Sequence, residues 1–348
     1  MKIALISYEF PPDSAHGGIA TYVREIALAL TAAGQHVEAF AFSPSRQGRH
    51  EVEGITVHFV DEADQFDFAY AVGYAFRERH REVGFDVIEG IEYNAHGRKA
   101  VRLAPECAYV LRMQTPTITL AEMDHTRGTI GERLRAIVGQ LRVLGGGIRR
   151  GGLLPTLDFE TRPDRTFVRQ QASLEAQEAR RADAVAGLCQ DMGDFAIRRW
   201  GVSAERVHVV PNPFQAAPAF LELPVVTEGQ RVGFFGRLER RKGVLDLAEA
   251  IPAILARHPQ AEFHFVGLAM DDPRTGKPYD ELVRARLAGR VVPERLVFHG
   301  RVPWASIPAA MGKMAVTVFP SHWEAFGYVC AEAMAAGRAI VASEAGGM

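Results

Sequence analysis

The sequence predicts an α/β protein with two doubly wound, Rossmann-like domains that face each other across a cleft. Three observations carry this prediction. Short β-branched runs alternate with helical patterns along the chain, and such alternation is typical of βαβ units in parallel sheets. A connector over 211–230, opened by Pro211-Asn212-Pro213-Phe214, interrupts the alternation once, and 231–348 resumes it. A length of 348 residues allows two domains of ordinary size.

The first domain is predicted over 1–210 and opens with a βαβ unit. Residues 2–7 form an apolar run that predicts a buried strand. Apolar side chains then recur at helical spacing from Ile19 to Leu30, the predicted helix ends near Gly34, and 36–41 resumes as a strand. Further strands are predicted at 56–59, 86–89, 107–111, 184–187 and 207–210.

The second domain, predicted over 231–348, repeats the alternation. Its strands are predicted at 231–236, 262–267, 296–300, 315–319 and 339–343, and its helices at 243–257, 279–288 and 328–336. Residues 344–348 are typical of a turn into another βα unit, so we expect this domain to be incomplete. Ligands of doubly wound sheets bind beyond the carboxyl ends of the strands, which places a substrate between the domains.

Composition and missing motifs argue against several classes of protein. The chain carries 40 Lys and Arg against 42 Asp and Glu, a balance that disfavours a nucleic-acid partner. Its three widely spaced cysteines favour a reducing compartment over a disulfide framework. No uncharged apolar run reaches the roughly 18 residues of a membrane span. HExxH, P-loop and dinucleotide-binding motifs are missing from the sequence, so we expect a cytoplasmic protein without metal or cofactor.

A first cluster of chemistry-bearing residues follows the predicted strand 231–236. Gly236 ends that strand, where a bulky side chain would block the close approach of a ligand to the backbone. Arg237 and Lys242 place two cations beside the start of a helix, whose free N–H groups favour anions. The cluster suits a diphosphate, and a solvated arginine-rich turn explains it equally well.

A second cluster follows the predicted strand 315–319. Glu324 falls in a loop at the carboxyl edge of the sheet, and Gly327 lets the backbone come close to a ligand. Glu332 lies inside the next helix among Ala and Met residues, where a carboxylate is costly unless it meets a hydrogen-bond donor. Sugar or ribose hydroxyls would supply such donors. An exposed helix glutamate is the alternative, and the neighbouring glycines favour the functional interpretation.

These motifs together resemble the family 4 retaining glycosyltransferases of the GT-B fold. The resemblance spans nearly the whole chain, and its strongest parts are Glu324-x7-Glu332 and Gly236-Arg237-x4-Lys242-Gly243. The remaining parts, in the same order as in the family, are Gly17-Gly18, Arg181-Ala182-Asp183, Pro211-Asn212 and Glu344-Ala345-Gly346-Gly347. The family continues past Gly347, so the resemblance also implies a C-terminally truncated chain.

The resemblance implies an enzyme that transfers a sugar from a nucleotide-sugar with retention of the anomeric configuration and without a metal. Arg237 and Lys242 would hold the diphosphate and, with Glu324 on the donor sugar, make up the catalytic set. Fixed cations would stabilise the negative charge on the leaving phosphate, which is the role of a metal ion in other enzymes. Glu332 would bind the ribose. The implied donor-binding set is Gly18, Gly236, Arg237, Lys242, Glu324, Phe326, Gly327 and Glu332.

Acceptor binding is expected in the first domain. The polar loop after strand 86–89 is interpreted as ligand-facing, with Glu92, Tyr93 and Asn94 as candidate acceptor residues, and Gln114, after strand 107–111, is the fourth candidate. His96 is expected to be structural or exposed instead of catalytic. The acceptor would be a glycan, a lipid-linked molecule or a small molecule.

Residues 127–150 carry six arginines and apolar residues at helical spacing. A basic amphipathic helix of this kind can lie on an anionic membrane surface, which would make the protein peripheral at the membrane. A helix packed on its own domain with its arginines in water is the more common alternative.

Two other functions stay open at this point. One is a truncated or degenerate sugar-nucleotide-binding protein without turnover. The other is a sugar-nucleotide epimerase or a glycosyl phosphorylase, because two-domain α/β clefts serve these enzymes as well.

Overall fold

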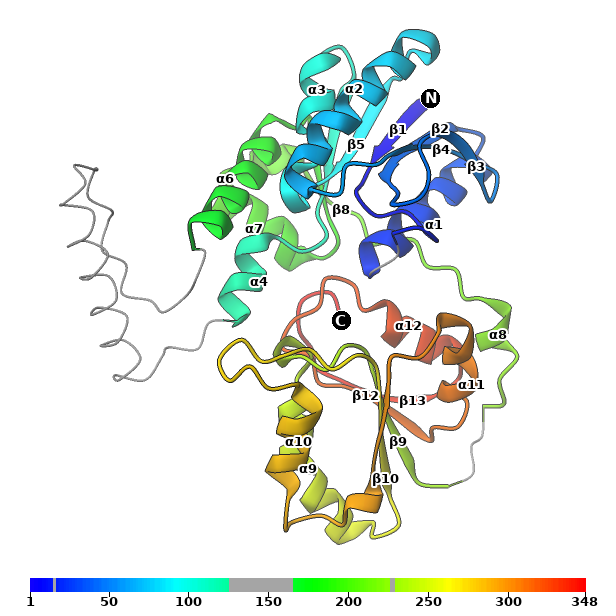
Figure 1. Cartoon of the computed structure of the whole chain (residues 1–348), viewed down its shortest axis with the longest axis vertical. Helices are drawn as coiled ribbons and strands as arrows, with labels where there is room; N and C mark the ends of the chain where they lie inside the picture. Colours follow the sequence, from blue (N-terminus) through cyan, green and yellow to red (C-terminus); the bar gives the residue numbers. More distant parts are fainter. Residues whose placement is uncertain (15–16, 125–164, 226–228) are drawn as a thin grey trace, which may run out of the picture.

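The structure is a computed structural model that describes residues 1–14, 17–124, 165–225 and 229–348. It contains two α/β domains, each built on its own parallel sheet, and Figure 1 shows one domain above the other with the C-terminus between them. The basic segment 127–150 lies outside the described residues, so its predicted helix and membrane contact stay predictions.

The first domain has an eight-stranded sheet in the order β3-β4-β2-β1-β5-β6-β7-β8. Its neighbouring strands are parallel except for β3 and β4, which pair antiparallel. The strands are β1 (Lys2–Ile6), β2 (His36–Phe42), β3 (Gly48–Val52), β4 (Ile55–Val60), β5 (Val87–Ile91), β6 (Ala108–Arg112), β7 (Ala184–Gly187) and β8 (Val207–Val209).

Helices cover both faces of this sheet because its central strands are apolar on both sides. In β1, Ala4 and Ile6 join one buried cluster, whereas Ile3 and Leu5 join a second cluster on the opposite face. The helices are α1 (Gly18–Ala32), α2 (Gln65–Val83), α3 (Arg98–Leu103), α4 (Thr117–Asp124), α6 (Arg165–Arg181) and α7 (Gln190–Trp200). Such two-sided burial is what a doubly wound sheet requires.

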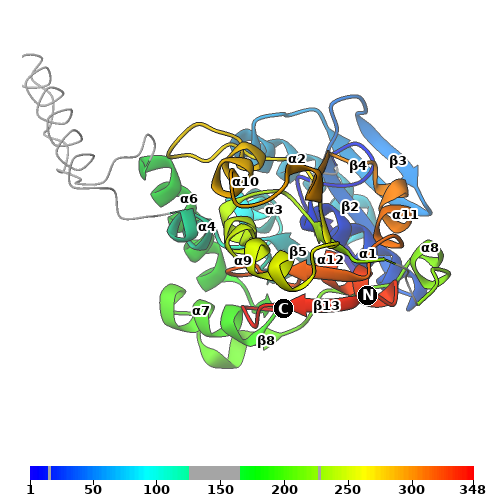
Figure 2. The same ribbon diagram turned by 90° about the horizontal axis from the view of Figure 1, so that it is seen from below.

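The second domain has a five-stranded parallel sheet in the order β11-β10-β9-β12-β13. Phe234 and Phe235 of β9 enter separate buried clusters, so helices pack on both faces here too. The strands are β9 (Arg231–Phe235), β10 (Glu262–Val266), β11 (Leu296–Gly300), β12 (Val316–Phe319) and β13 (Ala339–Ala342). The helices are α9 (Val244–Arg257), α10 (Tyr279–Leu287), α11 (Ile307–Met311) and α12 (Tyr328–Ala335). Seen from below in Figure 2, α12 and β13 lie together at one side of the molecule.

Every strand predicted from the sequence is present within a residue or two of its predicted bounds. The strand β3 was not predicted. Its pairing with β4 follows from a two-residue turn at Glu53 and Gly54, which both have positive φ angles, 52° and 81°. Turns of this type match the twist of an antiparallel hairpin.

The connector between the two sheets is held on both sides. Arg112, at the end of β6, donates to the Asn212 side chain at 2.8 Å. The Tyr328 hydroxyl, at the start of α12, donates to the Pro213 carbonyl at 3.2 Å. The connector also contains the short helix α8 (Pro218–Leu221), and the domain bounds predicted at 210 and 231 stay predictions. Among the described residues, no helix has the length and apolarity needed to cross a bilayer.

Candidate active site

Strands β9 and β12 lie side by side, so the segments that follow them meet at the carboxyl edge of the second sheet. After β9 the chain passes Gly236, with φ 136°, and forms a short 3-10 helix, η3 (Arg240–Lys242). After β12 it passes Ser321 and Glu324 before α12 begins. Lys242, one of the two sequence-predicted cations, and Glu324, one of the two predicted acids, are therefore brought to one place.

Glu324 is the centre of this cluster. Lys242 donates to Glu324 Oε1, Ser321 Oγ donates to the same atom at 2.9 Å, and Arg241 Nη1 donates to Oε2 at 3.2 Å. Burial raises the pKa of Glu324, but the charges of Lys242 and Arg241 outweigh it and hold that pKa below its usual value. Burial lowers the pKa of Lys242, and the attraction of Glu324 opposes this effect.

The sequence did not single out Arg241, which lies beside Lys242 and bonds Glu324. The Arg237 side chain is 52% exposed and reaches Glu239 at 3.5 Å, whereas Arg241 bonds both Glu239, at 2.8 Å, and Glu324. A run of three basic residues does not reveal which one turns inward. The Arg237 charge also acts on Tyr93 of the first domain, where it opposes the rise in the pKa of that residue.

Tight backbone contacts fix the cluster. Gly243, with φ 66°, separates η3 from α9, and a Cβ there would stand 1.8 Å from the carbonyl oxygen of Pro320 at the end of β12. A Cβ on Gly236 would meet only the Lys242 Cε, at 4.0 Å. Gly236 therefore supplies a left-handed conformation and keeps the space beside the Lys242 side chain open.

Glu332 occupies a different place in the second domain. It lies on α12, away from the bonds that hold Glu324, and a hydrogen bond links it to the Trp304 side chain. Burial raises the pKa of Glu332 to about 7, and the Trp304 hydrogen bond partly offsets this rise. Trp304 itself is 63% exposed and was not predicted as a site residue.

The loop between the two acids contacts the first domain. Phe326 packs against the larger buried cluster of the first domain, together with Trp323 and Ala325. Gly327 has φ 80° and begins α12. A Cβ on Gly18, at the start of α1, would touch the ring of Tyr328 at 3.7 Å. Gly18 of the first domain and Phe326 of the second thus lie close to the boundary between the domains.

Three of the four predicted acceptor residues are buried. Glu92 is fully buried and accepts from the backbone N–H groups of Gln114 and Thr115 at 2.7 and 2.6 Å. Burial, together with the charge of Glu175, raises the pKa of Glu92 to about 8. The Gln114 amide lies 3.5 Å from the Asn212 side chain, and Asn94 is 6% exposed. These three residues are therefore part of the packing that supports the loops at the carboxyl end of the first sheet.

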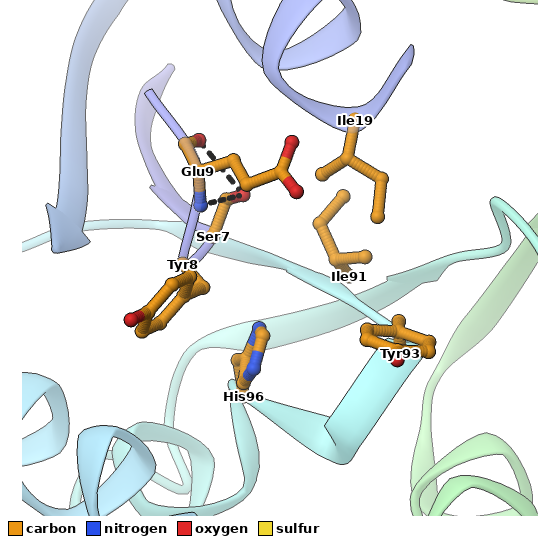
Figure 3. Close-up of a pocket in the computed structure, with 7 residues that line it drawn as sticks. All are labelled: Ser7, Tyr8, Glu9, Ile19, Ile91, Tyr93 and His96. Carbon is orange, nitrogen blue, oxygen red and sulfur yellow. Dashed lines mark hydrogen bonds between the residues drawn. The ribbon is translucent and has the colours of Figure 1, made fainter. Parts of the chain in front are cut away.

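Tyr93, the fourth residue predicted to bind the acceptor, lines a pocket at the carboxyl end of β1 and β5 (Figure 3). Ser7, Tyr8 and Glu9 form one wall of this pocket, which we call the β1 pocket, and His96 forms part of its floor. His96 was expected to be structural or exposed. It is 3% exposed, and within the described structure neither of its ring nitrogens has a hydrogen-bond partner.

Metal-ligating side chains do not gather anywhere in the described ranges: no group of three His, Cys, Asp or Glu is placed to hold an ion. The positive charges at the ends of β9 and β12 come from side chains of the chain itself.

Comparison with protein families agrees with this arrangement. The model of the family described as "Glycosyl transferase 4-like domain" matches residues 17–213, more than half of the chain. The chain belongs to the family 4 glycosyltransferases of the GT-B fold. A second family model, "Glycosyl transferases group 1", matches residues 229–348 of this glycosyltransferase.

Three relatives illustrate the breadth of this family. Glycogen synthase of Mycobacterium tuberculosis is 25% identical over all of this chain and 79% of its own length. Phosphatidyl-myo-inositol mannosyltransferase of Mycolicibacterium smegmatis is 37% identical over 42% of this chain and 37% of its own. The structure of Anabaena HepE in complex with UDP and glucose superposes with a TM-score of 0.63 at 19% identity, covering all of this chain and 82% of that one.

Proposed function

We propose that this glycosyltransferase moves a sugar from a nucleoside-diphosphate sugar to a hydroxylated acceptor, with retention of the anomeric configuration and without a metal ion. The observation that carries the proposal is the cluster in which Lys242 and Arg241 share the Glu324 carboxylate at the ends of β9 and β12. Preorganised cations at this edge of a parallel sheet suit an anionic ligand.

A diphosphate fits the charge of this cluster. The cluster contains two acids, Glu239 and Glu324, and four cations, Arg237, Arg240, Arg241 and Lys242. Its cations therefore exceed its acids by two. A donor diphosphate would compete with Glu324 for the Lys242 ammonium. The freed Glu324 carboxylate could then accept hydrogen bonds from the hydroxyls of the donor sugar.

Glu332 and Trp304 suit the nucleoside half of the donor. A carboxylate accepts two hydroxyl hydrogen bonds at once, as ribose offers. An indole that is 63% exposed presents a flat face on which a base can stack. The exposed Trp304 therefore extends the proposed donor site beyond the residues that the sequence singled out.

Charge also supports a metal-free mechanism. Breaking the glycosyl–phosphate bond builds negative charge on the leaving phosphate, and Lys242, Arg241 and Arg237 are the side chains proposed to stabilise it. The acceptor hydroxyl would approach from the first domain, whose Tyr93 lies within the electrostatic reach of Arg237. Retention requires that attack and departure take place on the same face of the donor sugar.

The test is a donor panel of UDP-, ADP- and GDP-sugars in the presence of excess EDTA. Nucleotide release is followed by chromatography, and the anomeric configuration of the product by NMR. We expect turnover that EDTA does not reduce and a product with the anomer of the donor. Binding without turnover would instead indicate a sugar-nucleotide-binding protein, and phosphate-dependent release of a sugar 1-phosphate would indicate a phosphorylase.

A further inference from the structure

Two buried carboxyl groups hold the turn that joins β6 to α4. Glu92, which follows β5, accepts from the backbone N–H groups of Gln114 and Thr115 at 2.7 and 2.6 Å. Glu175, on α6, accepts from the backbone N–H of Thr117 at 3.0 Å and from the hydroxyl group of the same residue. Both acids are fully buried, so these bonds form in a medium of low dielectric constant, where a hydrogen bond is strong.

The two acids account for all of the backbone donors in this turn, residues 114–117. Pro116 has no N–H group, and each of the other three residues donates its N–H to one of the two carboxyl groups. A buried N–H group without a partner is costly, so the loss of either acid would destabilise the turn. Side chains from two other elements therefore determine where the turn lies.

The turn in its own right determines where α4 lies. Helix α4 begins at Thr117, packs on α6 and lies beside η3, the short helix that ends in Lys242. Figure 1 shows α4 extending from the first domain toward the second. A shift of the turn would therefore move α4 relative to η3. The two acids are thereby linked, through α4, to the cations that bond Glu324.

Both acids keep a proton at pH values where an exposed glutamate has lost it. Burial raises the pKa of Glu175 to about 7. Burial and then the charge of Glu175 raise the pKa of Glu92 to about 8. The Oε2 atom of Glu92 has no hydrogen-bond partner among the described residues and is available to carry the proton. Ionisation of both acids would bury two like charges against one turn, which is unfavourable.

The other charged and titratable groups on the elements around this pair do not compensate its burial. They are Tyr93, Arg98, Arg102, Tyr109, Glu178 and Arg181. The three arginines bond the Glu178 carboxylate or main-chain carbonyls. Burial raises the pKa of both tyrosines, which therefore stay protonated. In the described part of the chain, no salt bridge joins a cation to Glu92 or Glu175.

We propose that Glu92 and Glu175 are positioning residues for sugar transfer, which hold the turn so that α4 stays beside η3, and that loss of their protons loosens α4 and lowers turnover. A carboxyl group whose pKa is raised on folding favours the folded arrangement below about pH 4.5, and this contribution is lost as the pH rises through about 7 to 8. Only the effect on turnover rests on the proposed function, because the attachment of α4 can be measured without a donor.

Hydrogen exchange measures the attachment of α4 directly. Protection factors of its amides are compared at pH 6 and pH 9 in the absence of ligands. We expect the protection of α4 to fall at least about tenfold, as the opening equilibrium grows for an acid with a pKa of about 7 when buried and 4.5 when exposed. Helix α9, in the second domain, is the internal reference. Constant protection of α4, or an equal fall in α9, would overturn the proposal.

Substitutions assign the effect to the two acids. The double variant Glu92→Gln with Glu175→Gln keeps acceptor oxygens for the turn but cannot ionise there, so α4 should stay protected at pH 9; Glu175→Gln alone should reduce the fall. Glu175→Ala should lower kcat at pH 6 about tenfold or more, the cost of a buried N–H left unpaired, and Glu175→Gln should restore it. Glu122→Gln, an exposed acid on α4, is the matched control and should behave like the unmodified protein. An undiminished fall in a folded double variant would refute the role of the pair.

A transfer assay at saturating donor then separates this inference from the proposed function. We expect kcat of the unmodified protein to fall between pH 7 and pH 9, and kcat of the double variant to stay level. If UDP-, ADP- and GDP-sugars do not turn over while the protection of α4 responds as expected, the proposed function fails and the attachment of α4 by the two acids stands. If the donors turn over and the double variant shows the same fall in kcat, the positioning role fails and the proposed function stands.

Discussion

Replacing Lys242 by Ala removes one of the two cations that hold Glu324. A unit charge about 4 Å from a developing phosphate charge contributes about 4 kcal/mol at the effective dielectric constant near a protein surface. Loss of one preorganised donor in other enzymes lowers kcat by about 10²–10³. Because Arg241 and Ser321 still bond Glu324, we expect the variant to fold and its kcat for sugar transfer to fall by about that factor.

The assay measures kcat for transfer under saturating donor, together with the unfolding temperature of each variant. Lys277→Ala, an exposed lysine in the loop before α10, is the matched control and should retain the rate of the unmodified protein. If the Lys242–Glu324 ion pair only stabilises the fold, the alanine variant will melt earlier but its folded fraction will turn over at the normal rate. A kcat within about twofold of the control would refute the catalytic role of Lys242.

Three further outcomes follow from the structure. Because the pKa of Glu332 is raised to about 7, its carboxyl group ionises as the pH rises through that value. The affinity for nucleotide-sugar, measured by calorimetry, should therefore increase from pH 6 to pH 8. Glu332→Gln should weaken this affinity and abolish its pH dependence. Burial raises the pKa of Glu38, but hydrogen bonds from Arg79 and His58 outweigh it and lower that pKa to about 2. The ionised Glu38 should therefore contribute about 3 kcal/mol to the free energy of unfolding above pH 4.5, and this contribution should be lost as the pH falls toward 2. In denaturant titrations at pH 7, Glu38→Gln should lose it, whereas Gln in place of the exposed Glu78 should not. Gly243→Ala should lower the free energy of unfolding by more than about 2 kcal/mol, because its Cβ would meet Pro320 at 1.8 Å, and Gly276→Ala, with the same φ of 66° and open space, isolates the conformational part of that cost.

The central strands of the first sheet were predictable because their apolar residues are buried on both faces. Ala4 and Leu5 pack on opposite sides of the same sheet, and that double burial is visible in the sequence as an unbroken apolar run. The polar edge strand β3, with the sequence Gly-Arg-His-Glu-Val, has no such run. Its only local sequence signal is the pair Glu53-Gly54, because a glycine in the second position of a two-residue turn favours a hairpin.

The candidate site was predictable in its chemistry and less so in its geometry. The motif that ends in Lys242 and the acid Glu324 were both recognised, and the structure brings them into one ion pair. Which arginine accompanies them depends on the turn of η3 and on the left-handed Gly243, and neither is encoded in a spacing rule. The burial of Glu92 and of His96, whose ring nitrogens have no partner among the described residues, depends on contacts between segments that are distant in the sequence, such as those of Tyr8 and Phe68 with the His96 ring.

The connector ties the two halves of the site together. Arg112 lies over the ring of Tyr22 at 4.6 Å while it donates to Asn212, so a residue of the connector is fixed to α1 and β6 at once. Tyr328 bonds the next residue of the connector, Pro213, from the first position of α12. A rotation of the second domain therefore moves the start of α12, and with it Glu332, relative to a connector that stays anchored on the first domain. Under such a rotation, the neutral hydrogen bond of Tyr328 would break more readily than the bond between Arg112 and Asn212, because a hydrogen bond from a charged guanidinium is the stronger of the two.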